Sequence, residues 1–316
     1  MNNEFRTTFP IAHKFKFSYK DNLLFVGSCF SENIGSILTQ FQFNTLVNPY
    51  GILYNPYSIE TQFREISEEK KYTTSDLSFF NDKWLSFNHH GAFSGINAEE
   101  CLMKINTSIQ ETNDFLRSAD YIFITLGTSI VYFNVDNDFP VGNCHKFPSK
   151  QFYIRRLSVY ETTESLNRII KYIRELNENA KIIFTVSPIR HWKDGAVENQ
   201  CSKATLILAI DEICNSVENT FYFPAYEIMM DDLRDYRFYK EDMLHPNAVA
   251  INYIWEKFKE SYIDVSCFDL MFEIEKLNRA LEHRVENTDG LEYIKYQEYI
   301  ESQKRKVAEK EREFYH

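Results

Sequence analysis

Leu23–Leu38 reads LLFVGSCFSENIGSIL, and this stretch decides the fold class. Four apolar residues are followed by Gly27-Ser28-Cys29 and then by apolar residues at helical spacing. This order predicts a buried strand, a tight turn and the start of a helix. A side chain at such a turn is held clear of the sheet, beside the free N–H groups of the new helix. Ser28 and Cys29 are therefore candidate nucleophiles, and Ser31 is expected to cap the helix.

The same pattern, an apolar run that ends in small polar residues, occurs twice more. Tyr121–Leu126 precedes Gly127-Thr128-Ser129, and Lys181–Val186 precedes Ser187-Pro188. Near-continuous apolar strands that alternate with helices indicate a parallel sheet covered on both faces. We therefore expect an α/β fold, a three-layer α/β/α sandwich of the flavodoxin-like kind, over residues 1–265.

Further elements follow from hydrophobic spacing and capping residues. Short strands are expected at about 43–47 and 220–223, and an irregular excursion with a hairpin at 70–97. A helix at about 59–69 is expected to be capped by Ser58, and the region after Gly127 is expected to be a loop. The remaining helices are expected at about 99–118, 158–177 and 199–217, and His245-Pro246-Asn247 is expected to open a helix through about Tyr262.

Residues 266–316 are expected to form a C-terminal helical extension, with helices at Leu270–Val285 and Leu291–Arg312. The second helix is dense in charged residues, but Tyr293, Tyr296, Tyr299 and Ile300 recur at three- and four-residue steps and form a narrow aromatic stripe. Such a stripe suits docking on a preformed surface, either the domain or a second copy, so a homo-oligomer through these helices is a candidate. Lys304–His316 is expected to be solvated.

Composition excludes several classes of protein. The chain has 316 residues and a formal net charge of −11, which opposes binding to a phosphate backbone and so argues against a nucleic-acid partner. No apolar run is long enough to span a membrane, and the N-terminus lacks the apolar segment of a secretory signal, so a cytoplasmic location is expected. The six cysteines are scattered, which argues against a disulfide framework or a zinc site. We expect no metal and no cofactor.

A second candidate group lies near the end of the domain, at Asp242-Met243-Leu244-His245-Pro246. A D-x-x-H pair before a helix places a carboxylate and an imidazole on one short loop. The carboxylate can bind one imidazole nitrogen while the other nitrogen faces a nucleophile. The chain order of nucleophile, aspartate and histidine favours nucleophilic catalysis.

These blocks together resemble the GSCFA family, which is similar to the SGNH (GDSL-type) esterases and acyl hydrolases. The resemblance covers about residues 20–262 and implies a nucleophile at Cys29, with Asp242 and His245 as the other two members of the triad. It also implies oxyanion-binding roles for Gly51, and for Gly127 and Ser129 in the block after the second apolar strand. Ser129 stands where that superfamily has an asparagine, and Cys29 where it has a serine. Ser28 remains the alternative nucleophile.

Further polar residues are expected at the same edge of the sheet. Asn143 and His145 lie in the loop after Tyr121–Leu126, and Ser187 and His191 follow the next strand. Ligands of open α/β sheets bind at the carboxyl ends of the strands, so these side chains are candidate substrate-binding residues. His191 is a second candidate base.

We therefore expect an SGNH-like hydrolase or acyltransferase, an esterase or O-acyltransferase, acting on a small-molecule or carbohydrate-linked acyl substrate. The alternative is a non-catalytic ligand-binding module that retains the fold. The replacements at Cys29 and Ser129 motivate that alternative.

Overall fold

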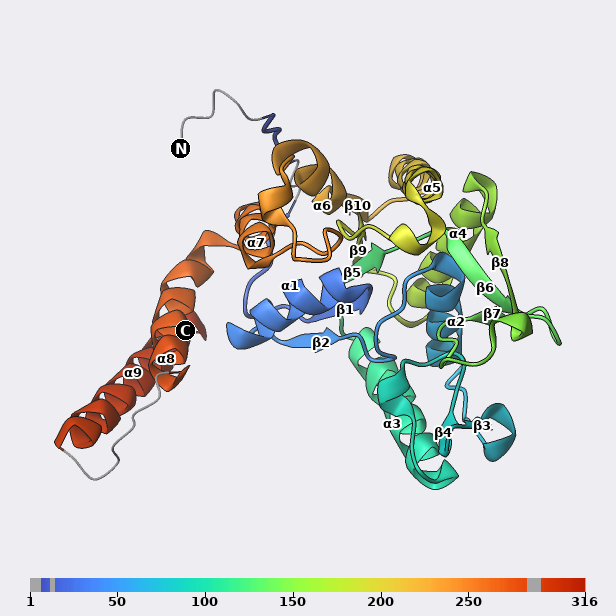
Figure 1. The fold of residues 1–316 in the computed structure, drawn as a ribbon. Coiled ribbons are helices and arrows are strands. Elements are labelled where there is room, and N and C mark those ends of the chain that lie inside the picture. The colour runs from blue at the N-terminus through green and yellow to red at the C-terminus, as the bar shows by residue number, and fades with distance from the viewer. Residues whose placement is uncertain (1–6, 12–14, 283–290, 316) are drawn as a thin grey trace.

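The computed structural model describes residues 7–11, 15–282 and 291–315. Its centre is a five-stranded sheet in which all neighbouring strands are parallel (Figure 1). In spatial order the strands are β10 (Thr220–Phe223), β9 (Lys181–Val186), β5 (Tyr121–Leu126), β1 (Leu23–Gly27) and β2 (Thr45–Val47). All residues of β1 are buried, and β1 lies inside the sheet rather than at an edge.

Helices cover both faces of this sheet. On one face lie α1 (Cys29–Gln40) and α7 (Ala248–Tyr262); on the other lie α2 (Pro56–Ser67), α3 (Ala98–Leu116), α4 (Val159–Leu176) and α5 (Ala196–Ser216). Successive strand residues alternate between the two faces. Phe25 of β1 stacks on Phe123 of β5 at 4.6 Å in the core beneath α1 and α7, whereas Leu24 lies in the opposite core. The predicted three-layer α/β/α sandwich is confirmed.

The region after Gly127, which was expected to be a loop, forms a second sheet. Strands β6 (Ile130–Asn134), β7 (Pro140–Val141) and β8 (Phe152–Arg156) pair antiparallel in the order β7-β6-β8. The prediction of a loop is wrong because β8 is exposed at four consecutive positions after Phe152 and so lacks the alternation of a half-buried strand. The hairpin predicted within 70–97 is present as β3 (Ser78–Phe80) and β4 (Lys83–Leu85).

Short helical segments complete the body of the molecule. They comprise α6 (Ala225–Glu227) and single turns at 74–76, 91–93, 149–151, 192–194, 228–232, 236–238 and 265–267.

Two helix caps differ from the prediction. Asn55, not Ser58, caps α2, because its Oδ1 accepts the N–H of Ser58 at 2.9 Å and Pro56 already occupies the first helical position. Ser28, not Ser31, caps α1, accepting the N–H of Phe30 at 3.2 Å. Ser31 lies inside the first turn and donates its hydroxyl to the carbonyl oxygen of Val26 at 2.9 Å.

The C-terminal helices α8 (Phe268–Glu282) and α9 (Leu291–Tyr315) form a pair that projects from the α/β body (Figure 1). Ile300 and Val307 are buried, and the Phe314 ring packs on Tyr19 at 5.4 Å. The prediction that Lys304–His316 is solvated is therefore wrong. The contact residues recur every seven positions, which keeps them on one side of the helix. In the aromatic stripe, Tyr296 donates to the carbonyl oxygen of Ala280 at 2.7 Å, but Tyr299 is exposed.

The apolar core beneath α1 and α7 continues into α8 and α9. The domain boundary near residue 265 and association through the C-terminal helices stay predictions, and Val285 and His316 lie outside the described residues. None of the helices in the described ranges combines the length and apolar character needed to cross a bilayer.

Candidate active site

The strand order changes direction around β1. From β1 the chain passes to β2 on one side and later to β5 on the other. In open parallel sheets such a switch point leaves a crevice at the carboxyl ends of the strands, and ligands bind there. A cavity of about 580 Å³ is lined by residues that follow β1, β5 and β9. Of the predicted site residues, it is lined by Ser28, Cys29, Asn143, Ser187, His191 and His245.

Cys29 is the first residue of α1 and is half-buried in the wall of this cavity. Burial raises the pKa of its thiol, the neighbouring Glu32 raises it further, and its own backbone N–H and Lys203 lower it. The burial effect is the largest, so at neutral pH the thiol is protonated. A nucleophilic role for Cys29 therefore needs a base to take the proton.

Ser28 also lines the cavity but is held by its backbone contacts. Its N–H donates to the carbonyl oxygen of Thr125 at 3.1 Å, and its hydroxyl oxygen caps α1. The side chain is 1% exposed. Cys29 is thus the more accessible of the two candidate nucleophiles.

Asp242 and His245 form a tight pair in the loop before α7. Asp242 Oδ2 lies 2.5 Å from His245 Nδ1, and Oδ1 accepts the N–H groups of Leu244 and His245 at 2.9 Å each. These backbone N–H groups, together with the imidazole, lower the pKa of Asp242 to about 2. The carboxylate is therefore ionised at neutral pH and holds the proton of His245 on Nδ1, which leaves the lone pair on Nε2.

His245 lines the cavity, whereas its partner Asp242 does not. Within the described residues Cys29 and His245 line the same cavity, and no hydrogen bond joins them. Among residues 7–11, 15–282 and 291–315, no group of three or more His, Cys, Asp or Glu side chains is placed to hold a metal ion.

Residues 22–258 match the GSCFA family. The chain belongs to the GSCFA family. The matched segment begins just before β1 and ends within α7, so it includes Cys29, Asp242 and His245. No protein with a curated functional description matches the chain.

His191 also lines the cavity of the GSCFA domain, near His245. Burial, together with the charges of Lys203 and His245, lowers its pKa to about 4. Its ring packs edge-on against Tyr54 at 5.4 Å. A histidine with so low a pKa is neutral at pH 7 and a weak base, so it is less suited than His245 to take the proton of Cys29.

Several predicted residues do not line the cavity. The N–H of Gly51 donates to the carbonyl oxygen of Asn48 at 2.7 Å, and that of Gly127 donates to Tyr54 at 2.7 Å. Ser129 is fully buried, and its hydroxyl lies 3.2 Å from that of Ser202. His145 bonds through Nε2 to the carbonyl oxygen of Ser86 at 2.8 Å. These groups support the loops around the cavity.

Asn55 is a cavity residue that sequence reasoning missed. It is 6% exposed, and its Oδ1 is committed to capping α2, so the amide is oriented with Nδ2 away from that bond. Together with the N–H of Cys29, it gives the cavity wall two donors suited to an oxyanion. The Asn55-Pro56 dipeptide is a signal for a helix start that could have revealed the cap, though not the amide's second role.

Lys203 of α5 lies beneath the site. Its side chain is 1% exposed, and Nζ donates to the carbonyl oxygens of Gly127 and Ser187 at 2.7 Å each. These carbonyls follow β5 and β9, so one ammonium group ties the two strand ends together. Burial lowers its pKa to about 7, and no carboxylate among the described residues forms an ion pair with it. Negative charge developing at Cys29 would compensate this buried positive charge.

The charge of Lys203 gives a testable pH dependence. Because burial raises the pKa of Cys29, its alkylation by iodoacetamide is expected to keep accelerating above pH 9, beyond the range of a free cysteine. With a pKa of about 7, Lys203 carries its charge only up to about neutral pH. Lys203→Met should therefore slow the alkylation of Cys29 near pH 6–7 and leave the rate above pH 9 unchanged. Mass spectrometry of the Cys29 peptide measures the profile, and thermal unfolding checks the fold. An unchanged alkylation rate at pH 6–7 in a folded Lys203→Met variant would show that the ammonium does not act on the thiol.

Proposed function

We propose that this GSCFA protein is an SGNH-like hydrolase or acyltransferase that transfers an acyl group from an ester through Cys29. The observation that carries the proposal is the Asp242–His245 pair, whose imidazole lines the same cavity as a cysteine at a helix N-terminus. The geometry supports the division of roles among nucleophile, base and orienting carboxylate. The resemblance to the SGNH superfamily supports the same assignment.

The reaction proceeds in two halves. Nε2 of His245 takes the Cys29 proton as Sγ attacks the ester carbonyl carbon, and the carbonyl electron pair moves to oxygen. When the tetrahedral intermediate collapses, the bond to the alkoxy group breaks and His245 returns the proton to it. Water or an acceptor hydroxyl then attacks the thioester with His245 again as base, which releases the acid or a new ester and restores the thiol.

Two donors are assigned to the oxyanion. The N–H of Cys29 lies at the positive end of α1, and Nδ2 of Asn55 is available because Oδ1 caps α2. This assignment replaces the N–H of Gly51, which is already donated to Asn48. The volume of about 580 Å³ suits a small-molecule or carbohydrate-linked acyl ester.

The direct test is a screen of p-nitrophenyl esters of increasing acyl length with the full chain. We expect turnover of at least one short ester and its loss in Cys29→Ala. Cys201→Ala is the matched control, because Cys201 is exposed and does not line the cavity. This control should retain full activity.

The rival function is a non-catalytic binding module, which the protonated Cys29 thiol favours. In that case no ester would be turned over, and Cys29→Ala would change neither turnover nor the binding of esters to the cavity. Turnover that survives in Cys29→Ala but is lost in Ser28→Ala would instead assign the nucleophile to Ser28.

A further inference from the structure

A second, larger cavity of about 760 Å³ lies beside the candidate active site. Val141 of β7 lines both cavities, so the short strand separates them. The walls of the second cavity come from α2, the 70–78 segment, the 86–88 segment and the turn between β6 and β7, with Arg168 of α4 at its edge. None of the proposed catalytic residues lines it.

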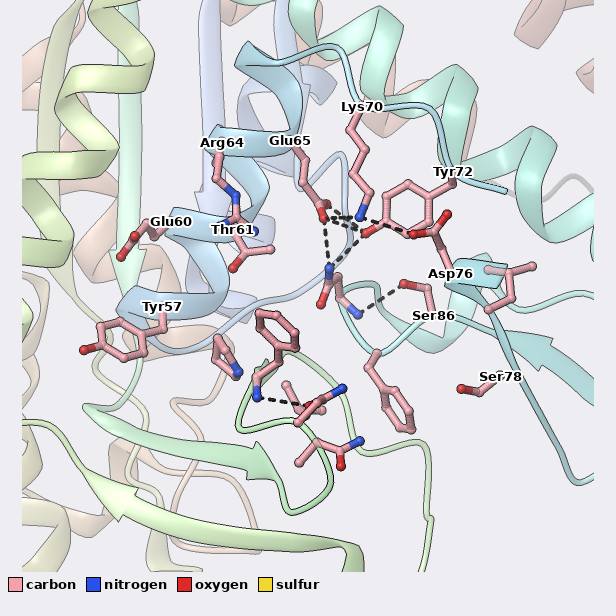
Figure 2. A pocket seen from close by; sticks show the side chains of 18 of the residues that line it. Tyr57, Glu60, Thr61, Arg64, Glu65, Lys70, Tyr72, Asp76, Ser78 and Ser86 are labelled. Atoms are coloured by element: carbon pink, nitrogen blue, oxygen red, sulfur yellow. Dashed lines mark hydrogen bonds and ion pairs between the residues drawn. The ribbon is translucent and has the colours of Figure 1, made fainter. Parts of the chain in front are cut away.

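One wall is built around a buried carboxylate. Glu65 is 1% exposed, and its oxygens accept from the Tyr72 hydroxyl at 2.8 and 2.9 Å, from Lys70 Nζ at 3.1 Å and from Asn88 Nδ2 at 3.0 Å. Figure 2 shows Lys70 and Tyr72 meeting Glu65 across the gap between α2 and the following segment. Both oxygens of the Glu65 carboxylate are therefore hydrogen-bonded within the protein, and these bonds hold the wall in place.

The other carboxylates of the cavity are also paired. Glu60 accepts two hydrogen bonds from Arg168, at 2.6 and 3.0 Å, and Asp76 lies 3.7 Å from Lys70. Among the residues that the structure describes, no hydrogen bond or ion pair is formed by the side chain of Arg64. Figure 2 shows Arg64 next to Thr61 on α2.

The turn opposite adds further donors. Oδ1 of Asn134 accepts the N–H of Asp136 at 2.9 Å, and Oδ1 of Asn137 accepts the N–H of Phe139 at 3.1 Å. In both amides the oxygen therefore accepts a backbone hydrogen bond, and the NH₂ group takes no part in the turn. With the guanidinium of Arg64, the cavity wall offers three side chains whose donors are not used by its carboxylates. A ligand that fits must be rich in acceptor oxygens, and Arg64 favours a planar or tetrahedral oxyanion.

From the guanidinium of Arg64, unpartnered among the described residues, and these two amides we propose that the second cavity binds a small organic molecule that carries one carboxylate or phosphate group, with its oxyanion on Arg64. This site is independent of the ester chemistry, since it shares with the candidate active site only the wall residue Val141. A bound ligand would rest against β7 on the side away from Cys29.

Calorimetric titration of the full chain with glucuronate, glucose 6-phosphate and glucose tests the proposal. We expect at least one of the two acidic sugars to bind at concentrations up to about 10 mM. Neutral glucose should bind at least about tenfold more weakly. Binding of glucuronate alone identifies a carboxylate site, and binding of glucose 6-phosphate alone identifies a phosphate site.

The variants locate the site. Arg64→Gln should weaken binding of the acidic sugar at least about tenfold, whereas Arg312→Gln, at an exposed position of α9 far from the lining, should leave it unchanged. Thermal unfolding of Arg64→Gln checks that the fold is kept. No binding of either acidic sugar, equal binding of glucose, or unchanged binding in Arg64→Gln overturns the proposal, whatever the outcome of the ester screen.

Discussion

His245→Ala is expected to lower ester turnover by at least about 100-fold, because the Cys29 thiol then loses its general base. The effect should be large since burial raises the pKa of Cys29, so little thiolate forms without help at neutral pH. Steady-state kinetics with the best ester from the screen measures the loss. Raising the pH should recover part of the activity in the variant, because hydroxide then generates the thiolate.

Asp242→Asn is expected to cause a smaller loss than His245→Ala. The asparagine keeps an acceptor for the N–H groups of Leu244 and His245 but removes the charge that fixes the imidazole tautomer. Added imidazole should partly restore His245→Ala and have no effect on Cys29→Ala. Equal activity of wild type and His245→Ala across pH 6–9 would remove His245 from the mechanism.

Gly27→Ala is expected to unfold much of the protein. Gly27 has φ of +125°, a conformation that an alanine rarely adopts, and an added Cβ would lie 2.1 Å from the carbonyl oxygen of Thr125. That oxygen belongs to β5, which is locked between β1 and β9, so it cannot move aside. Strain and overlap together should cost about 3 kcal/mol or more, a large share of the stability of a typical domain.

Gly91→Ala is the matched control, because nothing lies within 4 Å of its added Cβ and its φ is not positive. Urea or thermal unfolding should place this variant within about 1 kcal/mol of wild type. If Gly27→Ala were equally stable, the turn before Cys29 would be able to relax, and the close contact with β5 would not fix the position of the thiol.

The sheet could be predicted because its strands are buried on both faces. Tyr121–Leu126 and Lys181–Val186 have the same bounds in the structure as in the prediction, because short continuous apolar runs are typical of strands buried in a parallel sheet. The exposed strand β8 lacked that signal. In α9, Ile300 belongs to the predicted stripe and is buried, but Val307 and Phe314 continue its seven-residue spacing into the half of the helix that was predicted to be solvated.

The candidate site was predictable where function coincides with a local motif. The D-x-x-H spacing predicted that Asp242 lies beside His245, because both are on one loop. The strand–turn–helix pattern predicted that Cys29 lies at the carboxyl end of β1. The placement of Lys203 depends on distant contacts instead. Nothing in the α5 sequence distinguishes Lys203, whose Nζ reaches two carbonyls on other elements, from a lysine exposed to solvent.

Covalent capture tests the central claim most directly. The full chain is mixed with an excess of p-nitrophenyl acetate, quenched in acid within the first turnover, and digested for peptide mapping by mass spectrometry. The account predicts one acetyl group on Cys29, absent from Cys29→Ala and formed more slowly in His245→Ala. An acetyl group on Ser28 or another residue, or ester turnover without any adduct on Cys29, would contradict it.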